Sequence, residues 1–300
     1  MSIPDAVTVR APGKLNLSLG VGRRRPDGFH PLATVFQAVS VYEEVTATAA
    51  DAMSLTVEGA DADRVPTDES NLAWRAALLV AQDVGMEPLV RLHVRKRVPV
   101  AGGMAGGSAD AAAALLACDA LWGAGLSKDR LVELAAELGS DVPFVLLGHT
   151  AVGTQRGDLL SPALCRGRYH WALATRRAGL STADVYRRFD ELVDPGTRDP
   201  EPDRDLLVAL RAADLAAVGR CLGNDLQAAA LELAPELERT LDAATRAGAL
   251  GAVVTGSGPT VAALGRSRRH ATELATAMRA AGEADQTLTV VGPVAGARAQ

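Results

Sequence analysis

In the first sixty residues, the hydrophobic positions repeat every two residues. From Leu15 to Val21 every second residue is a leucine or valine, and the residues between them are small or polar. This alternation is typical of a β-strand with one buried face. We predict strands over residues 7–11, 15–21, 35–48 and 53–57, with Pro12-Gly13 forming a turn between the first two.

From residue 71 to residue 138, hydrophobic positions mostly take the spacing of helices, and the residues at the expected helix ends support this interpretation. Residues 71–85 predict a helix that Ser70 caps, and residues 128–138 predict one that Ser127 caps. Between them, a strand over 89–97 leads through a glycine-rich loop into an alanine-rich helix over 108–122.

After Gly157 the chain becomes rich in proline and arginine, which suggests a boundary between domains of residues 1–157 and 158–300. In the second half we predict strands over 169–175 and 287–291, a strand–turn–strand over 252–264, and helices over 182–192, 205–213, 215–233 and 236–247. The pattern as a whole predicts a mixed α/β protein.

Composition narrows the classes of function. The net charge of −5 argues against general nucleic-acid binding. The three cysteines lack the spacing of a metal site, and their odd number fits a reducing compartment. No apolar run is long enough to span a membrane, and residues 1–13 do not resemble a secretion signal. We expect a soluble, cytoplasmic protein with a small-molecule partner; its oligomeric state stays open.

The segment from Pro99 to Asp110 carries the strongest chemical signal. Its four glycines lie where a strand passes into a helix. Such a loop presents unpaired N–H groups at the positive end of the helix dipole, which suits a phosphate. A flexible loop ahead of a core helix is the simpler alternative, but this context and Ser108, a candidate helix cap and metal ligand, favour phosphate binding. The P-loop and Rossmann glycine motifs are both absent from the sequence.

Further candidates are weaker when taken singly. Lys14 follows the Pro12-Gly13 turn, which could direct its ammonium inward. Asp141 lies among small and apolar residues, as either a buried cap or a functional carboxylate. Phe29 and His30 end a loop rich in arginine and could stack on a base and read its edge. The segment 255–260 reads TGSGPT, which by itself predicts only a tight hairpin turn.

Taken together, three segments in order resemble the GHMP kinase superfamily: APGKLNLSLGV at 11–21, PVAGGMAGGSADAAAAL at 99–115 and VVTGSGPTVAAL at 253–264. The resemblance covers nearly the whole chain. It implies a two-domain α/β fold, with an N-terminal domain like ribosomal protein S5 domain 2 and a ferredoxin-like C-terminal domain. ATP and substrate would meet in the cleft between them.

The resemblance also implies roles for particular residues. Asp141 would accept the proton of the attacking hydroxyl, and Lys14 would hold both in place. Asn71 and Lys96 would hold the adenosine of ATP, and Mg²⁺ would bridge its phosphates, with Ser108 as a candidate ligand. The loop around the ATP phosphates would comprise Pro99, Val100, Ala101, Gly102, Gly103, Met104, Ala105, Gly106, Gly107, Ser108 and Ala109.

Within the superfamily, residues 25–39, 70–77, 138–148 and 223–226 resemble kinases of the non-mevalonate isoprenoid pathway. The implied substrate is a cytidine-diphosphate-linked methylerythritol. Phe29 and Tyr186 would sandwich the cytosine, His30 would pair with its edge, and Asn16 and Thr182 would lie near the methylerythritol.

Two alternatives remain: another GHMP kinase, of the homoserine, mevalonate or galactose type, and a ligand sensor without turnover. The chain also departs from the family pattern at three places. Phe29 replaces a common tyrosine, Ala105 a usual glycine, and Ala109-Asp110 a serine-rich pair. Asp110 would either help to hold Mg²⁺ or favour the helix dipole.

Overall fold

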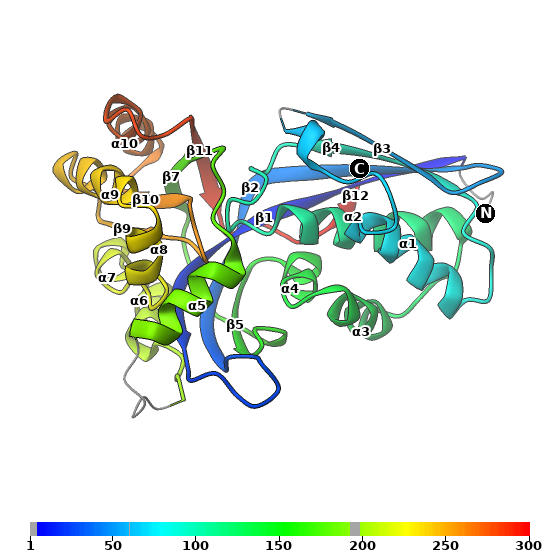
Figure 1. Ribbon diagram of the computed structural model, residues 1–300, viewed down its shortest axis with the longest axis horizontal. Coiled ribbons are helices and arrows are strands. Elements are labelled where there is room, and N and C mark those ends of the chain that lie inside the picture. Colours follow the sequence, from blue (N-terminus) through cyan, green and yellow to red (C-terminus); the bar gives the residue numbers. More distant parts are fainter. Residues whose placement is uncertain (1–4, 60, 193–198) are drawn as a thin grey trace.

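The computed structural model describes residues 5–59, 61–192 and 199–300. These residues form two β-sheets that lie side by side, each covered by helices (Figure 1). The larger sheet has the strand order β12-β1-β2-β4-β3, with β5, β6 and β8 joined to it. Its strands are β1 (Ala6–Val21), β2 (Leu32–Ala49), β3 (Ser54–Gly59), β4 (Val90–Lys96), β5 (Thr150–Gln155), β6 (Leu159–Pro162), β8 (Gly223–Asn224) and β12 (Arg298–Ala299).

Strand β1 differs from the prediction in two ways. Pro12 and Gly13 do not make a turn; the strand continues through them with a shift of register against β2. A proline is tolerated at such a bulge, where the ladder is already interrupted. Moreover, the polar side of the strand is buried as well as the apolar side, because Lys14, Asn16 and Ser18 face the rest of the protein and not solvent. The predicted half-buried strand is therefore wrong.

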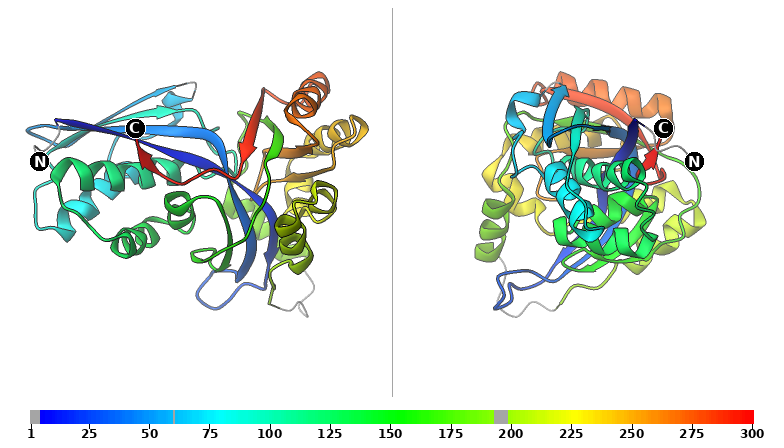
Figure 2. Two further views of the ribbon diagram at one scale, coloured as in Figure 1. Left: turned by 180° about the vertical axis from the view of Figure 1, so that it is seen from behind. Right: turned by 90° about the vertical axis from the view of Figure 1, so that its right-hand side faces the viewer.

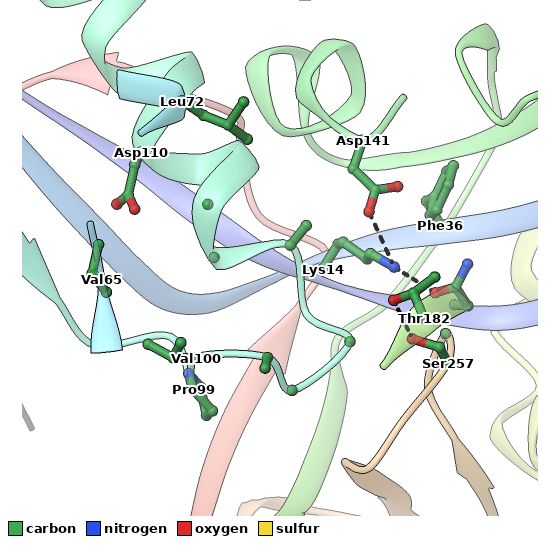
Figure 3. Close-up of a pocket in the computed structure, with 18 of the residues that line it drawn as sticks. Lys14, Phe36, Val65, Leu72, Pro99, Val100, Asp110, Asp141, Thr182 and Ser257 are labelled. Atoms are coloured by element: carbon green, nitrogen blue, oxygen red, sulfur yellow. Dashed lines mark hydrogen bonds and ion pairs between the residues drawn. The ribbon is translucent and has the colours of Figure 1, made fainter. Parts of the chain in front are cut away.

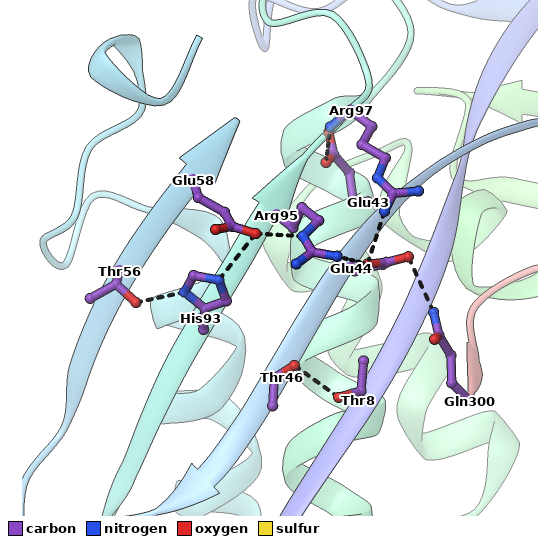
Figure 4. A network of polar contacts seen from close by, with 10 residues as sticks. All are labelled: Thr8, Glu43, Glu44, Thr46, Thr56, Glu58, His93, Arg95, Arg97 and Gln300. Carbon is purple, nitrogen blue, oxygen red and sulfur yellow. Dashed lines mark hydrogen bonds and ion pairs between the residues drawn. The ribbon is translucent and has the colours of Figure 1, made fainter. Parts of the chain in front are cut away.

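Helices cover one face of this sheet: α1 (Leu72–Asp83), α2 (Gly106–Trp122), α3 (Lys128–Leu138) and α4 (Val142–Leu147). Near β3 and β4 the opposite face is polar, whereas Leu15, Leu17 and Val35 of β1 and β2 pack against the second sheet. In the polar part, Arg95 contacts Glu44 and Glu58, and Arg97 contacts Glu44 (Figure 4). Exposed ion pairs of this kind contribute little to stability, so burial of the helical face holds this half together.

Helix α2 lies at the centre of that core, where alanines allow it to pack closely against β1, β2 and α1. Two predicted caps are wrong. The cap of α1 is Asn71, not Ser70, since the Asn71 side chain accepts a hydrogen bond from Ala73 N. Ser108 does not cap α2, which begins two residues earlier, at Gly106, after Ala105 in the left-handed conformation. The Ser127 cap of α3 is confirmed.

The second sheet is antiparallel, with the order β11-β7-β10-β9. In chain order this is 4-1-3-2, which agrees with the predicted ferredoxin-like layer. Its strands are β7 (Tyr169–Thr175), β9 (Gly251–Val254), β10 (Val261–Gly265) and β11 (Gln286–Gly292), and its helices are α5 (Thr182–Leu192), α6 (Arg204–Ala212), α7 (Leu215–Arg220), α8 (Gln227–Leu233), α9 (Glu236–Arg246) and α10 (Arg268–Ala280).

The single helix predicted over 215–233 is wrong, because the chain leaves the helical path between α7 and α8 to form β8. Asn224 in this break donates hydrogen bonds to the carbonyls of Val254 and Gly256. The break therefore supports the hairpin loop between β9 and β10.

Among the described residues, three strands from beyond residue 157 belong to the first sheet: β6 pairs with β5, and β8 and β12 come back to it from further along the chain. Both β8 and β12 pair with β1, and Figure 2 shows the C-terminus lying against the N-terminal half. The division of the chain at residue 157 stays a prediction. No helix among the described residues is long and apolar enough to cross a membrane.

Candidate active site

A cleft of about 470 Å³ is lined by residues from both halves of the chain. Its walls are the polar face of β1, the glycine-rich loop, the start of α4, helix α5 and the loop between β9 and β10. Figure 3 shows how side chains from these elements point toward a common space. A volume of this size suits a small-molecule ligand.

Lys14 is the charged centre of the cleft. Its ammonium donates a hydrogen bond of 2.7 Å to Asn16 Oδ1 and lies 3.6 Å from Asp141 Oδ2 (Figure 3). Asn16 in turn donates to Thr34 Oγ1, and Thr34 donates to the Ser18 carbonyl. This chain of bonds fixes the orientation of each group, so the ammonium has a defined position in the cleft.

Asp141 stands at the N-cap position of α4, but its side chain caps nothing. Its side chain is 33% exposed, against 5% for Lys14, so it is not the buried cap that was one alternative. Helix α4 is held by Phe144, whose ring stacks on Phe36 of β2 at 4.8 Å. The carboxylate is thus free to accept a hydrogen bond from a ligand in the cleft.

The glycine-rich loop takes unusual backbone conformations. Ala101, Gly103 and Ala105 all have positive φ angles, of 54°, 73° and 60°. Alanine adopts this conformation at a cost of roughly 1–2 kcal/mol. The loop therefore takes a positive φ at position 105 although alanine replaces the usual glycine there. The Met104 carbonyl accepts a hydrogen bond from Lys14 N, which ties the loop to β1.

The residues of this loop do not all face the cleft. Met104 and Ala109 are buried in the hydrophobic core, and neither they nor Ser108 lines the cleft. Those that line it are Pro99, Val100, Ala101, Gly102, Gly103, Ala105, Gly106 and Gly107. The first turn of α2 starts at Gly106 and leaves N–H groups without partners in the helix. The side of the loop that faces the cleft is therefore mostly backbone, as phosphate binding requires.

Lys96 belongs to a buried group of three charges behind the loop. Its ammonium lies 2.6 Å from Asp110 and 2.8 Å from Glu43. Glu43 also accepts a hydrogen bond from the backbone N–H of Arg97 (Figure 4). It accepts another from the N–H of Val98, the residue just before the loop. Lys96 thus supports the loop, besides lining the cleft where adenosine was predicted.

Burial and mutual repulsion of the two acids change their protonation. Burial, followed by the nearby Asp110, raises the pKa of Glu43 to about 7. Burial raises the pKa of Asp110 to about 6 although Lys96 opposes the rise. One oxygen of Asp110 has no hydrogen-bond partner among the described residues. Asp110 therefore belongs to this buried group, and neither of its predicted roles is needed to explain its position.

Asn71 and the hairpin loop complete the two ends of the cleft. Asn71 lines the cleft, yet its side chain already caps α1 and donates to the Pro66 carbonyl. At the other end, Thr182 Oγ1 lies 3.0 Å from Ser257 Oγ, and Thr255 Oγ1 accepts from Asn16 N. The hairpin predicted at 255–260 is confirmed, and it joins the second sheet to the polar face of β1.

The residues predicted to hold a base are divided between two cavities: Tyr186 lines the cleft, whereas Phe29 and His30 line a second cavity that shares Arg156 with it. His30 stacks obliquely against Tyr186 with the ring centres 4.9 Å apart. Phe29 is 49% exposed and lies in the second cavity, where the Arg156 guanidinium covers its ring at 3.7 Å. Arg156 lines both cavities. Phe29 and Tyr186 therefore do not form a closed sandwich in this structure.

Burial raises the pKa of the Tyr186 hydroxyl, and the nearby Asp141 raises it further. This hydroxyl therefore stays neutral at physiological pH.

Sequence reasoning missed Glu43, Arg156 and Asp190. The first is an acid within a predicted strand whose neighbours are largely apolar, and that break in pattern was the available signal. Asp190 contacts His30 at 2.7 Å across 160 positions of sequence, and Arg156 reaches Phe29 from a strand end that was not predicted. Because the partners in both contacts are far apart in sequence, no local pattern indicates either contact.

Comparison with known families agrees with this geometry. The family model for the GHMP kinase N-terminal domain matches residues 71–149, and the model for the GHMP kinase C-terminal domain matches residues 206–284. The chain belongs to the GHMP kinase family. The two-domain α/β fold expected for such a kinase is confirmed.

Individual relatives cover almost the full chain. A protein of Thermobifida fusca named 4-diphosphocytidyl-2-C-methyl-D-erythritol kinase is 53% identical, with 99% of each chain covered. A protein of the same name from Streptomyces coelicolor is 54% identical, covering 97% of this chain and 98% of that one. A crystal structure of 4-(cytidine 5'-diphospho)-2C-methyl-D-erythritol kinase superposes with a TM-score of 0.78 at 32% identity, covering 95% of this chain and 99% of that one.

Proposed function

We propose that this GHMP kinase transfers the γ-phosphoryl group of ATP to the 2-hydroxyl of 4-diphosphocytidyl-2-C-methyl-D-erythritol, in the methylerythritol phosphate pathway to isoprenoid precursors. The observation that carries the proposal is the placement of Lys14 and Asp141, 3.6 Å apart, in a cleft that the glycine-rich loop also lines. The substrate is inferred from the relatives named 4-diphosphocytidyl-2-C-methyl-D-erythritol kinase, which match almost the whole chain. A cytoplasmic location stays a prediction.

In the proposed reaction, Asp141 accepts the proton of the substrate hydroxyl. The hydroxyl oxygen forms a bond to the γ-phosphorus, the bond from phosphorus to the β–γ bridging oxygen breaks, and ADP leaves. Lys14 holds the carboxylate and the hydroxyl in place, and its charge favours the oxygen as it loses its proton. The bonds from Lys14 through Asn16 to Thr34 keep the ammonium in position before substrate arrives. Phosphoryl transfer depends mainly on such positioning and charge neutralisation.

The phosphates of ATP would lie along the cleft side of the glycine-rich loop, at the N-terminus of α2. The described residues contain no group of three acids, histidines or cysteines able to hold a metal by themselves. This fits Mg²⁺ that arrives on the nucleotide, because Mg²⁺ commonly takes most of its ligands from phosphate and water. Ser108 would have to rotate toward the cleft to serve as a ligand, whereas Asp141 already faces it. The metal would neutralise charge on the phosphates.

The second cavity and the cleft together favour this substrate over those of other GHMP kinases. Their residues Phe29, His30 and Tyr186 offer two aromatic faces and an imidazole edge, which suits a nucleobase. Arg156, the cation that lines both cavities, lies where a diphosphate would connect the base to the polyol. Homoserine, mevalonate and galactose have neither a base nor a diphosphate to use these groups.

A substrate panel tests the proposal. ATP consumption is measured with the cytidine-diphosphate substrate, homoserine, mevalonate and galactose in parallel, and the product is identified by phosphorus NMR. We expect turnover with the first compound alone. Turnover with another member of the panel would favour a different GHMP kinase, and binding of ligand without ADP release would favour a sensor.

A further inference from the structure

We propose that Asp190 is a positioning residue that selects cytosine over uracil, by fixing which nitrogen of His30 carries the proton. The inference rests on the proposed function and adds to it a residue that determines specificity. Its basis is the 2.7 Å contact between Asp190 Oδ1 and His30 Nε2.

The environment holds the imidazole ring firmly. His30 is 9% exposed, its ring lies 4.9 Å from that of Tyr186, and Phe189 packs edge-on against it at 6.2 Å. Phe189 and Asp190 are consecutive residues of α5, so the same helix that supplies Tyr186 also fixes the ring and its partner. The contact is therefore part of the packing between α5 and the loop that carries His30.

The contact determines the chemistry of the other ring nitrogen. A carboxylate accepts hydrogen bonds, so Nε2 must carry a hydrogen to donate. In a neutral imidazole this leaves Nδ1 without a hydrogen, as an acceptor. Among the described residues, Nδ1 of His30 has no hydrogen-bond partner. It is therefore available to a ligand.

An acceptor at this place distinguishes the two pyrimidines. Cytosine has an exocyclic amino group that donates a hydrogen bond to Nδ1, whereas uracil has a carbonyl oxygen there, which repels it. With the opposite tautomer, Nδ1 would donate and would favour uracil. Asp190 keeps the ring in the form that suits cytosine, although Asp190 itself touches neither base.

The test compares kcat/KM for the cytidine substrate and its uridine analogue. We expect wild type to prefer cytidine by roughly a hundredfold or more, since a lost hydrogen bond and an unpaired buried group each weaken the complex. Asp190→Ala frees both tautomers, and we expect the preference to fall about tenfold or more, with kcat for cytidine nearly unchanged. Asp190→Asn keeps an oxygen that can accept from Nε2 and should recover part of the preference.

Glu191→Ala is the matched control, because Glu191 is the next residue of the same helix and, among the described residues, forms an ion pair with Arg188 and no contact with His30. It should leave the preference unchanged. Nitrogen NMR of labelled His30 provides an independent readout: we expect protonated Nε2 and bare Nδ1 in wild type, and a mixture in Asp190→Ala.

The outcomes separate the two proposals. If wild type prefers cytidine and Asp190→Ala keeps both the full preference and the single tautomer, the role of Asp190 is refuted while the function stands. If wild type phosphorylates neither nucleotide substrate, both proposals fail.

Discussion

The polar side chains of the cleft hold one another in place. Lys14 is buried; its ammonium donates a hydrogen bond to Asn16 and forms an ion pair with Asp141. Asn16 in turn donates a hydrogen bond to Thr34. Because each partner restricts the next, little reorganisation is needed when a hydroxyl enters between the ammonium and the carboxylate. Removing either charged group, the ammonium of Lys14 or the carboxylate of Asp141, therefore leaves the other without an opposite charge beside it, which is unfavourable.

Asp141→Asn keeps the shape of the side chain and removes its basicity. We expect kcat to fall on the order of a hundredfold or more, the usual effect of losing a general base. The fold should persist, because the Asp141 side chain caps nothing in α4. Steady-state kinetics and thermal unfolding measure the two effects. A variant with a kcat close to that of wild type would exclude Asp141 as the base.

Lys14→Met separates positioning of the hydroxyl from binding of phosphate. Methionine fills most of the buried volume but leaves Asn16 and Asp141 without the ammonium. We expect kcat to fall more than the affinity for ATP, since Lys14 lies beside Asp141 rather than within the glycine-rich loop. Calorimetric titration with ATP, alongside kinetics, makes the comparison. Lost ATP affinity with an unchanged kcat at saturation would identify Lys14 as a phosphate ligand instead.

Glu43→Gln tests the buried charges behind the loop. Burial and then Asp110 raise the pKa of Glu43 from 4.5 to about 7, so the folded state retains a proton that the unfolded chain loses. Stability from this source is complete below pH 4.5 and is lost as the pH rises through 7.

Between pH 5 and 8, wild type should therefore lose more stability than Glu43→Gln, by on the order of 2 kcal/mol. Urea unfolding at several pH values measures this difference. Parallel pH profiles for the two proteins would show that Glu43 is ionised throughout.

At the residue scale, the sequence was informative where chemistry follows a local motif. Lys14 and Asp141 were weak candidates singly and were paired through the resemblance of their segments to a known family, and the structure places them 3.6 Å apart. Glu43 and Asp190 could not be identified in this way, because their importance comes from contacts with Lys96 and His30 that only the folded chain creates.

At the scale of elements, the glycine-rich loop depends on its contact with the β9–β10 hairpin loop. A Cβ on Gly103 would lie 2.5 Å from the Thr255 carbonyl oxygen, a backbone atom that cannot move aside easily. Gly103 also has a φ of 73°. The two loops therefore approach as closely as they do only because residue 103 has no side chain.

We expect Gly103→Ala to lower stability by about 2–4 kcal/mol, from backbone strain and a clash together, and to raise KM for ATP. Gly282→Ala is the matched control: its φ is 83°, but a Cβ there meets nothing within 4 Å. Denaturant unfolding measures the loss of stability in both variants, and the difference between the two losses is the cost of the clash, because both share the backbone strain. Equal losses of stability would show that the two loops separate without cost.

Elements were predictable where hydrophobic periodicity is regular. Helix α3, its cap and strand β7 lie where the pattern placed them. The pattern failed at β1, where buried polar residues serve the cleft, and at residues 215–233, where Asn224 bonds to the hairpin loop instead of continuing a helix. Both failures occur where a long-range polar contact overrides the local preference.

At the scale of the whole molecule, the C-terminal segment connects the second sheet to β2 and α4 of the first half. After β11, Val294 N donates to the Ala38 carbonyl and Ala297 N donates to the Val145 carbonyl. Val145 lies in α4, the helix that begins beside Asp141. The segment passes so close to α4 that a Cβ on Gly296 would lie 2.2 Å from the Leu146 carbonyl oxygen.

Gly296→Ala should therefore loosen the contact between this segment and α4. We expect a loss of stability of about 1–3 kcal/mol, the usual cost of overpacking, together with a lower kcat, because the start of α4 positions Asp141. ATP affinity should change little, since the backbone hydrogen bonds of this segment go to β2 and to α4 and the residues just after it. Gly223→Ala is the control, as a Cβ there meets nothing within 4 Å. Unfolding, kinetics and ATP titration distinguish the effects: a destabilised variant with the kcat of wild type would show that the C-terminal segment stabilises the fold without positioning Asp141.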